Sequence, residues 1–416
     1  MNYKTKLFDC SENTWANACV GDNGSPGYWE YARGFSKAAN LLLDFALEHS
    51  DPIDIDTLVY PIFFNMRHSI ELRIKSAIGM LISMAKFRGV NYSIDLVKSH
   101  DIGRLWMCFK DEALKVDSRY SDLIGSLDDY IFDLNLVDST GQVFRYPYSN
   151  DDVKHLTEVS IINFVSLSES FRIIEEKFDQ LYELNNYLIN ECSQGTHTKR
   201  LSRSDIKDIS LIVPAFGQWR TESFKEKKKV ILHRYEISSR EFSRALDFIK
   251  NNYEFSRNVE IEIGLKGVSD SSLLFFVKKW VELKRESFCA GGRVEGGIVK
   301  MSPEVMKSTL VFKDQLYGFL SEILTAEFLA GIDALFYFSK DLDFSERYVK
   351  VYELSLAEMQ SEFRRSNERA ALDNIAGKFN LVNGMFKSLD FLGKGSLKEK
   401  IILESGVSAD GYVRGS

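Results

Sequence analysis

Proline is scarce in this chain of 416 residues, which contains only six. None of the six lies in 62–146, 148–213 or 304–416. Because proline lacks a backbone N–H and its ring clashes with the preceding helical turn, it kinks or ends most helices. The sequence therefore permits long helices over most of its length.

Cysteine is also sparse, with five residues at positions 10, 19, 108, 192 and 289. The number is odd, the positions are scattered, and no CxxC pair occurs. This spacing excludes a disulfide framework and the usual zinc motifs. We expect reduced, mostly buried thiols and no metal site.

Targeting and cofactor motifs are missing as well. The start, MNYKTKLFDCSENTW, lacks the apolar core of a signal peptide, and no stretch approaches the roughly 18 to 20 apolar residues that span a bilayer. The motifs GxxxxGK[ST], HExxH, GxSxG and GxGxxG do not occur, which excludes the commonest ATP, zinc, serine-hydrolase and dinucleotide sites. We expect a cytoplasmic protein with no membrane partner and no cofactor.

The composition is that of an ordered globular protein, with 44% hydrophobic residues, 27% charged residues and 30 phenylalanines. At this length the chain exceeds one ordinary helical core, so two domains are expected. Its net charge of −7 argues against a protein that coats DNA, because affinity for the backbone comes from neutralising phosphates.

Hydrophobic periodicity predicts a mainly α fold. An N-terminal segment, 1–27, precedes an antiparallel helical bundle over 28–192. Its expected helices cover 28–48, about 54–87, a stretch starting near 101, 119–136 and 152–190, with a loop at 138–152. Asp54 or Asp56 is expected to cap the second helix, with Pro61 tolerable only near its first turn, and Ser99 or Asp101 to cap the third.

The second half is predicted to be a mostly helical domain, 205–416, that follows a polar and basic linker at 193–204. Ser238 and Glu241 form a capping-box pattern for a helix to about Asn251. The alternating VEIEIGL, 259–265, is typical of a short strand, and GGRVEGG, 291–297, of a hairpin or loop. The stretches 269–289 and 303–404 have helical periodicity.

The stretch 199–240 is markedly basic, with 11 Lys and Arg against 5 Asp and Glu. Basic residues alternate there with Trp219 and Tyr235, a pattern that suits single-stranded nucleic acid. The alternative interpretation is a solvated surface. The candidate nucleic-acid-binding residues are Arg200, Arg203, Lys207, Lys227 and Lys228.

A charged patch interrupts the apolar second helix within FNMRHSIELRIKSAI, 64–78. At about 100° per residue, Arg67, His68, Glu71 and Lys75 share one arc, apart from both the apolar stripe and the wet face. An ion-pair network accounts for this pattern without any function, because Glu71 is four residues from both Arg67 and Lys75. The alternative is a chemical site at the floor of a groove.

Two further segments carry polar groups that suit such a site. His100 precedes Asp101 at a predicted helix start, where backbone N–H groups favour an anion. In FRYP, Arg145 stands between Phe144 and Tyr146, and a rigid turn of this kind can present a guanidinium to a phosphate. A capping Asp101 and a packing Arg145 are the alternatives without function.

The order RHSIELRIKSA, then SHDIGRLW, then FRYP before a long helix resembles HEPN-like helical bundles of bacterial conflict and defence systems. The resemblance covers about residues 28–190. It implies a bundle of four or five helices that often forms a homodimer and acts on RNA, in many members as a metal-independent endoribonuclease toxin in antiphage defence. Other members bind only nucleotides or partner proteins. The family's Arg-x4–6-His signature is absent here.

Cleaving RNA without metal requires a base for the 2′-OH proton, an acid for the leaving oxygen and positive charge at phosphorus. We predict His68 and His100 as acid and base, with Glu71 to orient them and Arg67 to hold the phosphate. Arg145, Tyr146, Asp101 and Lys75 are the predicted substrate contacts. The alternatives are a noncatalytic scaffold of a defence complex and a nucleotide-binding switch.

Overall fold

The computed structural model describes residues 14–49, 51–89, 99–149, 151–289 and 303–411, and these residues are mostly helical. They form fifteen α-helices and no strand, with a single isolated bridge between Tyr148 and Lys154. The prediction of a mainly α fold is therefore confirmed. None of the helices in these ranges has the length and apolar character needed to cross a membrane.

The chain divides into two compact units, Met1–Gly195 and Thr196–Ser416. The boundary lies inside the range 193–204 that the sequence predicts as a linker. Both ends of that range belong to helices, because α5 ends at Ser193 and α6 begins at Arg203. Ser202 caps α6 in a reciprocal capping box with Asp205.

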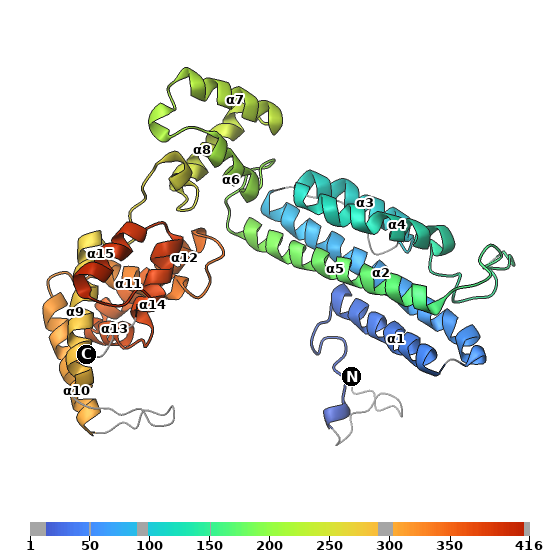
Figure 1. Cartoon of the computed structure of the whole chain (residues 1–416), viewed down its shortest axis with the longest axis horizontal. Coiled ribbons are helices and arrows are strands. Elements are labelled where there is room, and N and C mark those ends of the chain that lie inside the picture. Colours follow the sequence, from blue (N-terminus) through green and yellow to red (C-terminus); the bar gives the residue numbers. More distant parts are fainter. Residues whose placement is uncertain (1–13, 50, 90–98, 150, 290–302, 412–416) are drawn as a thin grey trace. The chain divides into compact units, whose positions relative to one another are not determined.

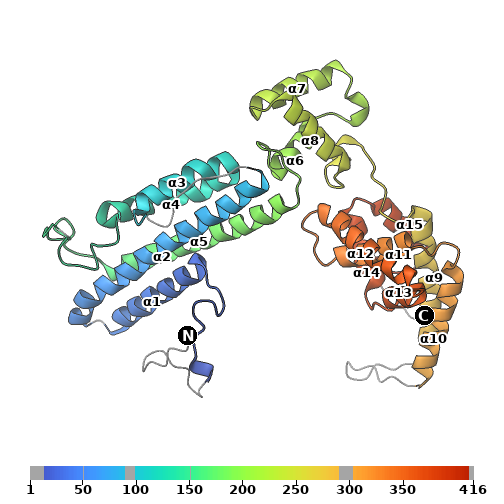
Figure 2. The same ribbon diagram turned by 180° about the vertical axis from the view of Figure 1, so that it is seen from behind.

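The first unit is a bundle in which α2 packs against α1, α3 and α5 (Figures 1 and 2). The buried stripe of α2 is the predicted apolar one, with Met66, Ile70, Ile74, Ala77 and Leu81. Its helices are α1 (Tyr28–His49), α2 (Pro52–Phe87), α3 (Ile102–Val116), α4 (Ser121–Asp138) and α5 (Phe164–Ser193).

The start of α2 differs from the prediction. Asp51 caps the helix through a hydrogen bond from the N–H of Ile53, so neither Asp54 nor Asp56 has that role. The cap lies earlier because Pro52 occupies the first helical position, where a missing N–H costs nothing. Pro61 therefore lies inside the helix, beyond its first turn. The expectation that the helix would tolerate this proline only near its first turn was wrong.

The prediction for α3 is confirmed, since Asp101 Oδ1 accepts the N–H of Arg104 at 2.8 Å.

The predicted fifth helix is too long at its start. Residues 151–163 form no helix, and Asn163 caps α5 before Phe164. Asp152 and Leu156 have positive φ angles, which an α-helix of L-residues does not accommodate.

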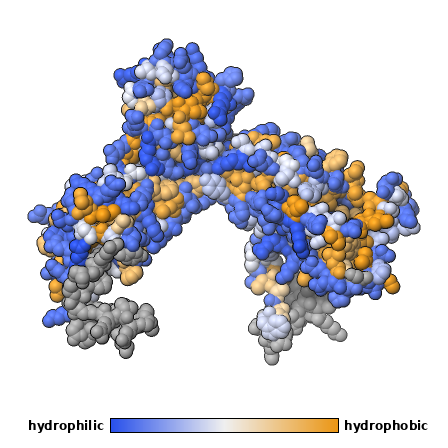
Figure 3. Space-filling view, in the orientation of Figure 1, coloured by the Kyte–Doolittle hydropathy of each residue, from blue (hydrophilic) through white to orange (hydrophobic). Residues whose placement is uncertain are grey.

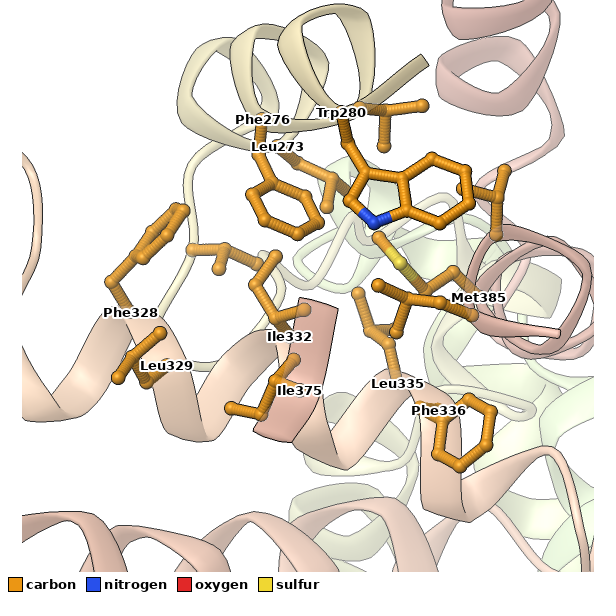
Figure 4. Close-up of a cluster of buried hydrophobic side chains, with 14 of the residues drawn as sticks. Leu273, Phe276, Trp280, Phe328, Leu329, Ile332, Leu335, Phe336, Ile375 and Met385 are labelled. Atoms are coloured by element: carbon orange, nitrogen blue, oxygen red, sulfur yellow. The ribbon is translucent and has the colours of Figure 1, made fainter. Parts of the chain in front are cut away.

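The second unit contains two hydrophobic cores. The smaller belongs to α6 (Arg203–Ile212), α7 (Glu222–Arg234) and α8 (Ser239–Asn251), which surround Ile206, Ile231 and Phe242. The larger is centred on α11, as Figure 4 shows. The remaining helices are α9 (Asp270–Cys289), α10 (Pro303–Leu320), α11 (Ala326–Phe338), α12 (Glu346–Arg364), α13 (Glu368–Ala376), α14 (Leu381–Phe391) and α15 (Gly395–Ser405).

The close-up of the larger core shows Phe276 and Trp280 of α9 directed at α11 and α14 (Figure 4). Trp280 Nε1 donates a hydrogen bond of 2.9 Å to the carbonyl of Ala376, so the buried indole has a partner. Almost every residue of α11 is buried, consistent with its nearly continuous apolar sequence.

The predicted strand at 259–265 was wrong. Its first residue, Val259, ends a short 3-10 helix, Ser256–Val259, and Glu260 takes a left-handed conformation. The N–H of Ile261 then returns to the carbonyl of Ser256, which leaves no extended ladder. Alternation alone could not reveal this, because a strand needs a partner and none lies in the described ranges. The predicted hairpin at 291–297 falls outside those ranges.

Candidate functional site

A buried carboxylate, Glu71, lies at the centre of the charged patch in α2. Its side chain is 2% exposed and lies between two cations one helical turn away on either side. Arg67 Nη1 donates to Oε2 at 2.6 Å, and Lys75 Nζ donates to Oε1 at 2.8 Å. All three side chains are buried, so the predicted arc forms an internal ion-pair network.

Arg67 is occupied by structural hydrogen bonds. Its Nε donates to the carbonyl of Asp138 at 3.1 Å, and its Nη2 donates to the carbonyls of His100 and Ser139 at 2.5 and 2.7 Å. The guanidinium thereby joins α2 to the end of α4 and the start of α3. Gly141, at φ +78°, passes so close that a Cβ there would lie 3.2 Å from the guanidinium carbon.

Two histidines lie beside the same carboxylate and reach the surface. His100 Nδ1 is 3.0 Å from Glu71 Oε1, and its side chain is 64% exposed. His68 Nδ1 is 3.9 Å from Oε2, and its side chain is 28% exposed. His68 is held in place by Phe35, which meets its ring edge-on, and by Phe64, which stacks on it. One carboxylate therefore lies at hydrogen-bond distance from His100 and within 4 Å of His68.

The electrostatic environment keeps Glu71 ionised. Burial by itself works to raise the pKa of this carboxyl, but His68, Lys75 and Arg67 more than offset the burial and hold its pKa well below the ordinary value.

Arg145 lies outside the ionic network and is linked to His68 through the ring of Phe64. Its guanidinium is stacked over Phe64, the ring that also stacks on His68, at 5.3 Å from the ring centre. It also lies over Tyr146 and donates a hydrogen bond of 3.3 Å to the hydroxyl of that residue. Both side chains are exposed.

The structure thus separates the eight residues predicted for the site. His68 and His100 lie beside Glu71 and reach solvent. Arg145 and Tyr146 lie on the surface, where Arg145 is linked to His68 through Phe64. Arg67 and Lys75 are internal, so a substrate phosphate has no direct access to them. The Asp101 carboxylate caps α3.

A cavity of about 970 Å³ lies next to Arg145 and Tyr146, between the start of α2 and the loop before α5. Glu71 and the two histidines do not line it, contrary to the prediction of one shared groove. Its polar lining includes Tyr60, Lys154 and His155, which the sequence did not single out. No motif could have indicated them, because only the path of the loop brings them to α2.

Comparisons with family models, with curated proteins and with solved structures gave no match. The HEPN resemblance therefore stays a prediction. In the described part of the chain, no three His, Cys, Asp or Glu side chains gather in a way that could hold a metal ion.

The basic stretch of the second unit is divided in the same way. Arg203 is buried, paired with Glu254 and Glu346, and stacked on Phe255 and Phe344. It joins α6 to α12 and is not available to a nucleic acid. The other four predicted residues reach the surface: Arg200, Lys207, Lys227 and Lys228. Lys228 lies over the ring of Phe242, and the side chain of Arg200 donates a hydrogen bond to the carbonyl of Glu236.

Proposed function

We propose that the first unit cleaves RNA without a metal ion, with His68 and His100 as its acid and base. The observation that supports this proposal is the single buried carboxylate, Glu71, in contact with the Nδ1 edges of two solvent-accessible imidazoles. A carboxylate that accepts a hydrogen bond from Nδ1 favours the tautomer whose Nε2 is free to take a proton, and His100 lies at the distance for such a bond. The HEPN resemblance supplies the expectation of RNA as substrate and of a role in bacterial defence.

The proposed reaction is an intramolecular transesterification. The Nε2 of one neutral histidine takes the proton of a ribose 2′-OH, and the 2′-oxygen forms a bond to phosphorus. The bond from phosphorus to the 5′-oxygen breaks, and the other histidine, protonated, gives its proton to that oxygen. Arg145 is the cation best placed to stabilise the phosphorane, because it is exposed and adjoins His68 through Phe64.

This proposal changes the predicted role of two residues. Arg67 and Lys75 contact Glu71 and no surface, so they are positioning residues that keep the carboxylate charged and in place. The missing Arg-x4–6-His signature is consistent with this change, since the family's arginine would have to come from elsewhere in the fold, here from Arg145.

The test is incubation of the purified full chain with total RNA in EDTA. The substitutions His68→Ala and His100→Ala should each slow cleavage by a factor of about 10² to 10⁴, which is the usual contribution of a general acid or base. The matched control is His49→Ala, an exposed histidine at the end of α1 whose Nδ1 contacts only the Phe45 carbonyl and ring. Cleavage that survives both site variants would contradict the assignment.

A noncatalytic scaffold is the second candidate, and one observation favours it. Arg67, the residue that begins the resemblance, makes four hydrogen bonds within the unit and has a purely structural environment. Absence of cleavage under all conditions, together with capture of a second copy or of another defence protein, would support this alternative. A nucleotide-binding switch would instead show saturable nucleotide binding that changes the oligomeric state.

Within the RNA proposal, the exposed basic residues of the second unit are expected to hold single-stranded RNA through its phosphates. Lys207→Gln combined with Lys227→Gln should weaken RNA binding and flatten its dependence on salt. Arg203→Gln should instead destabilise the unit, because its partners Glu254 and Glu346 would lose their cation.

A further inference from the structure

The cavity at the end of the first unit is lined by both apolar and polar residues, with the apolar ones more numerous. The start of α2 supplies Ile55 and Val59, and the loop before α5 supplies Leu156, Val159 and Ile162. Its volume, about 970 Å³, is at the upper end of the range typical of small-molecule sites. Apolar side chains also reach the surface where α1 ends and α2 begins, as the orange areas in Figure 3 show. The cavity therefore suits a ligand with an apolar body.

The charges around this cavity are mostly positive. Arg145 and Lys154 both line it, and within the described ranges no carboxylate lies at ion-pair distance from either. Asp56 supplies the one carboxylate of the lining that the structure describes. Two cations without an acidic partner, next to an apolar wall, favour an anionic group on the ligand.

His155 also lines the cavity, but its Nε2 does not open into it. This nitrogen is buried, and no hydrogen-bond partner for it exists among the described residues. Arg145 and Lys154 are therefore the groups that indicate an anionic ligand.

We propose that this cavity binds a small amphipathic anion, an apolar chain that carries one carboxylate or phosphate group. The chain lies against Val59, Leu156 and Ile162, and the anionic group lies between Arg145 and Lys154. This site shares Arg145 with the residues proposed for RNA cleavage, but Glu71, His68 and His100 do not line it and the tests below act on Lys154, so either proposal can fail without the other. A mononucleotide is the competing ligand, and the test below includes one.

The test is isothermal titration of the full chain with four probes: decanoate, decyl phosphate, decanol and AMP. Decanoate or decyl phosphate should bind with one site per chain and a negative heat-capacity change, the mark of apolar burial. The comparison between these two identifies the head group. Decanol, which lacks the charge, should bind at least about tenfold more weakly, since a charge-assisted hydrogen bond is worth roughly a factor of ten or more.

Two exposed substitutions locate the binding. Lys154→Gln should weaken the binding of the better anionic probe about tenfold. The matched control, Lys86→Gln, removes an exposed lysine at the opposite end of α2 and should leave binding unchanged. The proposal is overturned if neither anionic probe binds, if decanol binds as tightly as the anions, if AMP alone binds, or if Lys154→Gln has no more effect than Lys86→Gln.

Discussion

Replacing Glu71 with glutamine tests the central network of the first unit. The substitution keeps the shape of the side chain but removes its charge. The new amide would keep one carbonyl oxygen, which could accept from either Arg67 or Lys75, while its NH₂ group would face the other cation. Both cations are buried and cannot turn to water.

The expected loss follows from that burial. Removing one partner of a buried ion pair costs about 3 to 5 kcal/mol, because it leaves a charge without compensation in a poorly hydrated interior. For a unit of the size of Met1–Gly195, that loss lowers the unfolding midpoint by roughly 6 to 20 °C. The control Glu112→Gln breaks a pair with Lys115, whose side chain is 65% exposed, and should cost less than about 1 kcal/mol.

Hydrogen exchange across urea concentrations, read on peptides from α2 and α5, measures the effect within this unit alone. An equal loss for the two variants would refute the idea that Glu71 holds a buried network. The dependence on pH provides a second check. Because the folded-state pKa of Glu71 is lowered, its stabilisation is complete above the ordinary value of 4.5 and is lost as the pH falls through the folded pKa. Wild type should lose more stability than Glu71→Gln over that acidic range.

Three further substitutions have expected outcomes that urea denaturation can check. Tyr120→Phe removes a buried hydrogen bond of 2.6 Å to Asn185 and should cost about 1 to 3 kcal/mol, with a smaller cost indicating that water reaches the amide. Arg203→Gln should cost about 3 to 5 kcal/mol in the second unit, and an unchanged midpoint would contradict its structural role. Gly267→Ala should lower the free energy of unfolding by at least about 2 kcal/mol, because φ is +71° there and a Cβ would overlap the Glu327 carbonyl. The control Gly264→Ala places its Cβ in open space and should cost less. Equal effects of the two substitutions would refute this reasoning.

Local signals accounted for most of the helices. The apolar stripe through Met66, Ile70 and Ile74 is buried as its 3.6-residue period predicts, and Asp101 caps α3 as its position before the helix predicts. These features depend on neighbours within one or two helical turns. A reader of the sequence can therefore find them without knowing the rest of the fold.

Predictions from local sequence patterns were wrong where the structure depends on residues far away in the sequence. The alternation at 259–265 lacked a strand to pair with among the described residues, and the loop after Asp152 took a positive φ that no periodicity reports. Arg203 looked like a surface cation in a basic stretch, yet carboxylates 51 and 143 residues away enclose it. A charge run gives no information about which of its members is buried.

The sequence by itself determined the helical class of the chain and the arc that brings Arg67, His68, Glu71 and Lys75 to one side of α2, because both follow from the period of a single helix. Only the tertiary structure decided which of these groups reach solvent. The end of α4 and the start of α3 supply the carbonyls that enclose Arg67, and α3 also brings His100 to Glu71. Burial depends on what packs against a helix, and that information lies in residues far along the chain.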